Sequence, residues 1–233
     1  MKSLDPIQMK ARIEKAYAAS GNSLHWRFLA SPCHVLKGAD VALIDLNPGG
    51  GSIPEDHPDF CMPSGSAYEL ESWDGGKRRK IPYPPGESPL QIQMRTLFLR
   101  LCVKAEDVLA GHLVPFRSPS WKELKGHEEA LRFGRQLWRE VFDVVRPSLV
   151  VVMGLNDAGP IIESLLGAGS TERVPIGWGA IAGRKSSFAG GRLVVLPHLS
   201  RFKVVTKEKC QPALQELFGR RYDPSLSLQK KAG

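Results

Sequence analysis

The chain has 233 residues, and its 32 lysines and arginines outnumber 24 aspartates and glutamates to give a formal net charge of +8. Its length suits one α/β domain, and a basic excess of this size favours a polyanionic partner such as DNA. No run of 18 apolar residues occurs, which excludes a transmembrane helix, and the polar N-terminus is unlike a signal peptide. We therefore expect a cytoplasmic monomer that does not bind membranes.

The four cysteines are too far apart in the sequence for a CxxC metal site, an iron–sulfur cluster or a dense disulfide framework. They are Cys33, Cys61, Cys102 and Cys210. We expect reduced, mostly buried thiols, no metal site and no cofactor.

The first predicted elements are a helix over residues 4–20 and a buried strand over 41–46, which ends in an Asn-Pro-Gly turn. Residues 49–90 then form a long polar loop that includes the basic run 77–80. A loop of this length in a compact domain is usually functional or mobile.

Helices and strands alternate through the rest of the chain. The predicted elements are a helix over 90–103, a strand over 111–115, a helix over 128–145, a strand over 149–154, a helix over 157–166, a strand over 193–197 and a helix over 207–220. This alternation predicts one domain over 1–222, a three-layer α/β/α fold with a central, mainly parallel four-stranded sheet. Residues 223–233 are expected to be a flexible tail.

Polar segments follow three of the predicted strands, at the sheet edge where ligands bind in such folds. The first runs from Asp45 to Gly51. A tight turn would by itself explain its proline and glycines, and the absence of a following Lys-Ser/Thr pair excludes a phosphate-binding P-loop. The second spans 111–119 and includes His112, and the third spans 196–202 and includes His198.

These segments resemble three motifs of the uracil-DNA glycosylase superfamily, in the expected order and over about residues 38–205. Asn47-Pro48-Gly49 is similar to the end of its Gly-x-Asn-Pro-Gly water-activating motif, with Asp45 in place of the first glycine. His198-Leu199-Ser200 is similar to its His-Pro-Ser motif, with leucine in place of proline. His112 stands where family members place a base-reading asparagine.

The resemblance implies a DNA glycosylase that everts a nucleotide from the helix and hydrolyses its N-glycosidic bond, leaving an abasic site. Asn47 would hold the attacking water, and neutral His198 would donate a hydrogen bond to the base oxygen as negative charge develops there. The other implied substrate-binding residues are Asp45, Leu46, Pro48, Gly49, His112 and Phe116. The implied DNA-binding residues are Arg117, Ser118, Ser200, Arg201, Phe202 and Lys203, with Phe202 either wedged into the duplex or packed in the core.

The sequence also bears on which base is removed. Uracil-specific members follow the motif proline with a tyrosine that blocks groups at pyrimidine C5, whereas this chain has Gly49, Gly50 and Gly51 there. Together with His112, the glycines favour a modified, C5-substituted pyrimidine over uracil. Deaminated or oxidised bases would indicate DNA repair, and the hypermodified pyrimidines of phage DNA would indicate antiviral defence.

Two other functions are compatible with the same motifs. One is a non-catalytic DNA-binding module that has kept the fold, and the other is a nucleoside or nucleotide hydrolase that uses the same strand-end cleft.

Overall fold

A computed structural model describes residues 3–51, 57–74 and 81–228 of the chain. The basic run 77–80 singled out in the sequence lies outside the described residues.

The core of the molecule is a six-stranded sheet in the order β2-β1-β3-β6-β5-β4. Its strands are β1 (Val41–Asp45), β2 (Leu109–His112), β3 (Leu149–Met153), β4 (Glu172–Trp178), β5 (Ile181–Phe188) and β6 (Gly191–Leu196). Strands β2, β1, β3 and β6 are parallel, and β5 and β4 continue the sheet, with β5 antiparallel to β6 and β4 antiparallel to β5. The α/β class is therefore confirmed, but the prediction of four strands is wrong.

The two additional strands form a hairpin over residues 172–188, a segment in which no strand was expected. Its burial pattern explains the miss, because β4 has exposed Glu172 and Arg173 at its start and buries alternate residues, Val174 and Ile176, on one face. Strand β4 also contains Pro175, which is atypical of a central strand. By contrast, β1 and β3 are buried at every position, the pattern of a parallel strand covered on both faces.

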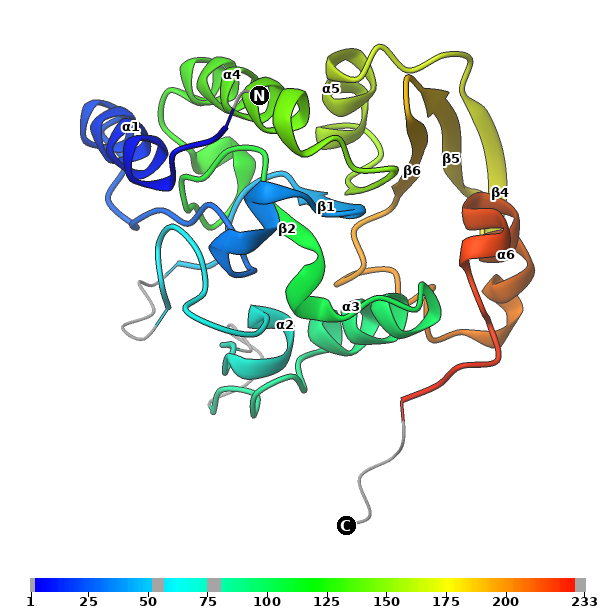
Figure 1. The fold of residues 1–233 in the computed structure, drawn as a ribbon. Coiled ribbons are helices and arrows are strands. Elements are labelled where there is room, and N and C mark those ends of the chain that lie inside the picture. The colour runs from blue at the N-terminus through cyan, green and yellow to red at the C-terminus, as the bar shows by residue number, and fades with distance from the viewer. Residues whose placement is uncertain (1–2, 52–56, 75–80, 229–233) are drawn as a thin grey trace.

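The helices cover both faces of the sheet (Figure 1). They are α1 (Pro6–Ala19), α2 (Ala67–Leu70), α3 (Pro89–Arg100), α4 (His127–Val145), α5 (Ala158–Leu165) and α6 (Gln211–Phe218). Figure 1 shows α1, α4 and α5 above the sheet, α2 and α3 below it, and α6 beside the β4–β5 hairpin. Short 3-10 helices span Cys33–Lys37, Ala105–Asp107, Trp121–Glu123, Glu208–Cys210 and Gly219–Arg221.

Alternate residues of each strand enter two separate cores. Ala42 and Ile44 of β1 point into the core under α1, α4 and α5, whereas Val41 and Leu43 point into the core under α2 and α3. This alternation matters for the site, because Asp45 is the next residue in the series of Val41 and Leu43. Its side chain therefore projects on the α2–α3 face of the sheet.

Local sequence signals set most helix boundaries within a few residues of the prediction. Asp5 caps α1 by accepting hydrogen bonds from the amides of Ile7 and Gln8. Ser88 and Gln91 form a reciprocal capping box that starts α3 at Pro89. The strand expected over 111–115 lies instead at Leu109–His112, so that His112 ends the strand rather than standing near its start.

The cysteines correct a further expectation. Cys33 and Cys61 are joined by a disulfide that closes a separation of 28 residues, so these two thiols are not free. Cys210 is a buried free thiol and Cys102 an exposed one. Sequence spacing gave no sign of the disulfide, because its two cysteines are far apart in the sequence. They are brought together only in the fold, where residues 57–62 run back beside Leu29. Backbone hydrogen bonds, such as the one from Leu29 N to Phe60 O, hold this segment in place.

The start of the expected tail lies against α3. The amide of Asp223 donates to the carbonyl of Arg100, and the Arg100 guanidinium donates to the carbonyl of Leu226. Among the described helices, none has the length and apolar character needed to cross a membrane.

Candidate functional site

Three ionisable side chains meet at the carboxyl ends of the parallel strands. Asp45 is the last residue of β1 and is paired in register with His112, the last residue of β2. His198 follows the end of β6 by two residues. In parallel strands, in-register side chains project on the same face, and Asp45 and His112 therefore share the α2–α3 side.

Asp45 is buried and directly contacts His198. Its Oδ2 lies 3.2 Å from His198 Nε2, and its Oδ1 accepts the amide of Leu46 at 2.8 Å. Burial opposes ionisation of this carboxyl, but the hydrogen bond and charge of His198, with smaller contributions from His112 and the Leu46 amide, hold the Asp45 pKa below its usual range. Both carboxylate oxygens thus have protein partners, and Asp45 is ionised at neutral pH.

His198 is held on both ring nitrogens. Nε2 donates to Asp45, while Nδ1 lies 2.7 Å from the hydroxyl of Ser200 and accepts the Ser200 amide at 3.3 Å. Burial lowers the pKa of His198, but the hydrogen bond and charge of Asp45 outweigh it, so that the pKa is raised overall. His198 therefore binds a proton more tightly than an ordinary histidine, which bears on the neutral donor that the sequence led us to expect.

His112 has the opposite electrostatic character. Burial lowers its pKa to about 3, and this effect exceeds the attraction of the Asp45 carboxylate. Its Nδ1 is enclosed and has no hydrogen-bond partner among the described residues. The ring is therefore neutral at physiological pH.

Asn47 has an amide group whose orientation is fixed by its surroundings. Its Nδ2 donates to the backbone carbonyls of Pro48 and Phe116, both at 3.2 Å, and lies 2.9 Å from the hydroxyl of Ser118. Because carbonyl oxygens can only accept, the NH₂ group must face them. The carbonyl oxygen of the side chain accordingly points elsewhere and is available as an acceptor.

The 116–118 segment supports this turn from the other side. The amide of Ser118 donates to the Pro48 carbonyl, and the guanidinium of Arg117 donates to the Gly49 carbonyl at 2.5 Å. Ser118 is 3% exposed, so its predicted role as a DNA contact is wrong for this conformation. Phe116 is also buried, with its ring stacked on Phe133 in the core instead of lining a base pocket.

The predicted substrate-binding residues on either side of Asn47 differ in how exposed they are to solvent. Leu46 is buried in the core, Pro48 is buried beneath the turn, and Gly49 is exposed. Each contributes backbone to the turn, and the side chain of Leu46 has no access to a ligand.

The loop after His198 divides into exposed and packed residues. Ser200, Arg201 and Lys203 are exposed. Phe202 packs against the core under α2 and α3, and its ring meets Trp178 edge-on at a centroid distance of 6.1 Å. Of the two roles considered for Phe202, the structure shows the packed one.

A buried network behind the strand ends was missed by the sequence analysis. The guanidinium of Arg27 pairs with the carboxylate of Glu71 at 2.7 Å, with side chains only 5% and 6% exposed. His57 Nδ1 lies 3.5 Å from the same carboxylate. Arg27 and Glu71 both act electrostatically on His112. These residues lie on loops in which no periodic pattern distinguishes them.

Tyr68 of α2 joins the network to Asp45. It is 4% exposed, and burial, reinforced by the nearby charges of Asp45 and Glu71, raises the pKa of its hydroxyl. Tyr68 is therefore an uncharged phenol on the same side of the sheet as Asp45.

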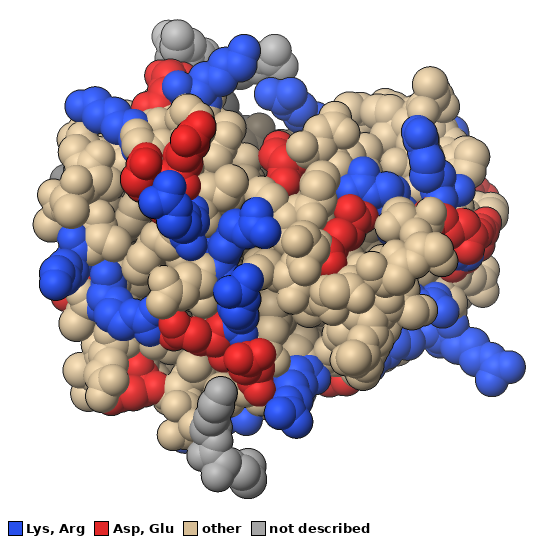
Figure 2. All heavy atoms as spheres, turned by 90° about the horizontal axis from the view of Figure 1, so that it is seen from above, with Lys and Arg blue, Asp and Glu red and all other residues tan. Residues whose placement is uncertain are grey.

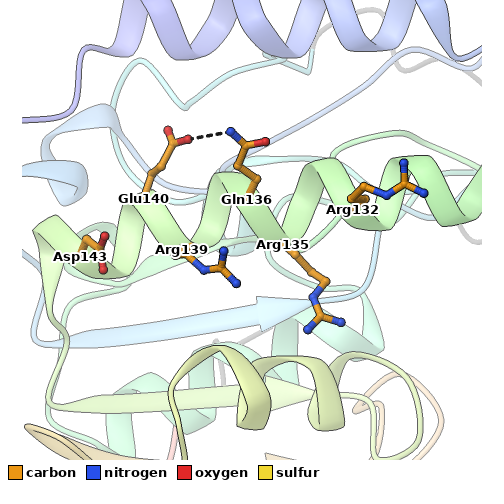
Figure 3. Close-up of a pocket in the computed structure, with 6 residues that line it drawn as sticks. All are labelled: Arg132, Arg135, Gln136, Arg139, Glu140 and Asp143. Carbon is orange, nitrogen blue, oxygen red and sulfur yellow. Dashed lines mark hydrogen bonds between the residues drawn. The ribbon is translucent and has the colours of Figure 1, made fainter.

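A separate groove lies along the outer surface of α4 (Figure 3). It is lined by Arg132, Arg135, Gln136, Arg139, Glu140 and Asp143, and contains none of the predicted site residues. Figure 3 shows Arg135 and Arg139 on one side of the helix and the hydrogen-bonded Gln136–Glu140 pair on the other. The face that carries α4 has basic and acidic side chains interspersed (Figure 2).

Among the described residues, no cluster of three histidine, cysteine, aspartate or glutamate side chains could hold a metal ion. No protein-family model matches the chain, and a comparison with curated proteins finds no match either. The residues at the strand ends are therefore the features of this chain that bear on its function.

Proposed function

We propose that the protein is a DNA glycosylase of the uracil-DNA glycosylase type, which hydrolyses the N-glycosidic bond of a modified pyrimidine rotated out of the helix. The proposal rests on the resemblance of the Asn47 and His198 segments to the motifs of that superfamily. It gains support from their position, because the segments follow β1 and β6, two parallel strands on either side of β3, at the carboxyl-end edge where ligands bind in such folds.

The orientation of the Asn47 amide is the observation that carries the proposal. Three acceptors hold its NH₂ group, which leaves the side-chain carbonyl oxygen to accept a hydrogen bond from a water molecule. An amide cannot deprotonate that water, so its contribution is to position the oxygen for attack. The rate must then depend mainly on stabilising the departing base.

The reaction balances as a hydrolysis. The bond between C1′ and the base nitrogen breaks with its electron pair moving to the base, and the water oxygen bonds to C1′. The proton lost by the water ends on the departing base. His198, whose side chain is 37% exposed, is the group of this site that we assign to the developing negative charge on the base.

His112 and the glycines of the turn support a modified base as the substrate. Neutral His112 offers Nε2 as either donor or acceptor, whereas an asparagine offers both at once. Gly49 and Gly50 are exposed and have no Cβ to limit the space over the turn. We propose that this space accommodates a substituent at pyrimidine C5.

The test is base release from DNA. Single- and double-stranded oligonucleotides containing uracil, 5-hydroxymethyluracil, 5-hydroxymethylcytosine or glucosylated 5-hydroxymethylcytosine are incubated with the protein. Abasic sites are then detected by alkaline cleavage, and released bases by mass spectrometry. We expect release from at least one C5-substituted substrate, and loss of release in Asn47→Ala and His198→Ala.

Other outcomes would refute the proposal in distinct ways. DNA binding without abasic sites would indicate a non-catalytic module, and cleavage of free nucleosides with none of DNA would indicate a nucleoside hydrolase. Activity on uracil alone would contradict the choice of a C5-substituted base.

A further inference from the structure

The contact between Asp45 and His198 has no counterpart in the motif that the chain resembles, because that motif has a glycine where this chain has Asp45. Here the Asp45 side chain is 11% exposed, and its Oδ2 lies 3.2 Å from His198 Nε2. The second oxygen is taken by the Leu46 amide. A carboxylate with both oxygens occupied is poorly placed to deprotonate water, so a role for Asp45 must pass through the imidazole.

We propose that Asp45 is a positioning residue whose buried carboxylate fixes the ring of His198 and holds it as the imidazolium cation beside the departing base. This inference rests on the proposed function. A cation at that position would neutralise the negative charge that gathers on the base as the glycosidic bond breaks, whereas a neutral imidazole carries no charge and gives its single N–H to Asp45.

Other charged groups face the same ring and set the balance. Asp157, at the start of α5, favours the cation, and Arg201 opposes it, as does burial. His112, the last residue of β2, interacts electrostatically with the Asp45 carboxylate that contacts His198. Asp45 contributes both a hydrogen bond and a charge to His198. These raise the pKa of His198, although burial and Arg201 lower it.

The site can accommodate the cation with the ring in place, although a protonated Nδ1 no longer accepts the Ser200 amide 3.3 Å away. The Ser200 hydroxyl, 2.7 Å from Nδ1, can donate to the neutral ring and accept from the protonated one. Nε2 keeps the same partner in both forms. The Asp45–His198 pair can therefore change protonation while the ring stays in place.

The direct test is a titration of His198 by NMR, with its signal among the six histidines assigned by loss in His198→Gln. In the native chain we expect His198 to titrate above its ordinary pKa. Asp45→Asn keeps the acceptor for the Leu46 amide but removes the charge, and should lower the proton affinity of His198 at least about tenfold. Asp157→Asn removes a charge that acts only through space, and is the matched control with a smaller effect.

The pH profile of base release provides the functional readout. Activity that needs the imidazolium falls as the pH rises through the pKa of His198. In Asp45→Asn this fall should move to lower pH, whereas a purely structural defect would lower activity at every pH without moving the midpoint.

The possible failures are distinguishable. A native His198 that titrates at or below its ordinary pKa would overturn the positioning role, even in an active enzyme and even if Asp45→Asn does not fold. An unchanged titration in a folded Asp45→Asn would overturn it as well. Absence of base release from every substrate would refute the proposed function, and the titration would still decide whether Asp45 holds the cation.

Discussion

The side-chain nitrogen of Asn47 lies 2.9 Å from the hydroxyl oxygen of Ser118, although the two residues are 71 positions apart in the sequence. The contact joins the turn after β1 to the segment after β2, and two backbone carbonyls complete the set of acceptors. The chemistry expected of Asn47 therefore depends on a segment that was itself expected to bind DNA.

This arrangement predicts that Asn47→Asp is more damaging than its small size change suggests. A carboxylate would face the carbonyl oxygens of Pro48 and Phe116, so the Phe116 carbonyl would lose the Asn47 donor and the Pro48 carbonyl would keep only the Ser118 amide. We expect a loss of about 1–3 kcal/mol in the free energy of unfolding and a fall of about 100-fold in base release. Urea unfolding and the abasic-site assay measure the two effects.

Ser118→Ala is the control for that substitution, because it removes one acceptor and leaves both carbonyls in place. Its effect should be smaller in both assays. Equal activity of Asn47→Asp and the native chain would show that the orientation of the amide is unimportant.

A second prediction concerns acid stability. The pKa of His112 is about 3 in the folded chain, well below the value of an exposed histidine, so the unfolded chain binds more protons between about pH 3 and pH 6.5. Stability due to His112 is thus complete at neutral pH and declines as the pH falls through this window. His112→Asn should lose less stability than the native chain between pH 7 and pH 4.

Thermal unfolding across that pH range measures the difference, and NMR should show His112 neutral down to about pH 4. Titration of this histidine near pH 6.5 would contradict the prediction and would also remove the argument that the ring is neutral when it meets a base.

The third prediction separates two basic surfaces. Arg201 and Lys203 are exposed beside His198, whereas Arg135 and Arg139 lie along the α4 groove in Figure 3. If DNA lies over the strand ends, Arg201→Ala with Lys203→Ala should reduce the salt dependence of binding by about two ion equivalents.

Arg135→Ala with Arg139→Ala removes the same number of charges and should leave the salt slope nearly unchanged. Fluorescence anisotropy of a labelled oligonucleotide at several salt concentrations measures both variants. A larger effect from the α4 pair would place the DNA on the outer surface of α4 and not over the strand ends.

The fourth prediction concerns the disulfide between Cys33 and Cys61. Closing a separation of 28 residues should stabilise the chain by about 3.5 kcal/mol through the entropy of the unfolded state. Cys33→Ser with Cys61→Ser, or reduction, should lower the midpoint of urea unfolding accordingly. Cys102→Ser provides the control, since that exposed thiol is free.

The sequence was informative where burial is uniform. The parallel strands β1, β3 and β6 were predicted close to their observed positions, because a parallel strand covered on both faces reads as a continuous apolar run. The hairpin formed by β4 and β5 gives no such run, since β4 alternates between exposed and buried residues and contains Pro175. Its existence became evident only from the sheet itself.

The candidate site was predictable in its members but not in their contacts. Motif order pointed to Asn47 and His198, yet Asp45 and His198 are 153 residues apart, and their contact depends on how β1, β3 and β6 are placed side by side. The buried state of Ser118 and the Arg27–Glu71 pair likewise arise from loop paths that no local pattern encodes.

The margins of the sheet have a consequence for solubility. Outside β2, the backbone of residues 28–30 is hydrogen-bonded to the strand, as in Ala30 N to Ala110 O and His112 N to Phe28 O. On the other margin, Pro175 lacks an amide hydrogen and the pairing of β4 shifts between Pro175 and Trp178. Neither margin presents a long, regular row of vacant donors and acceptors, so recruitment of strands from other molecules into aggregates is disfavoured at both.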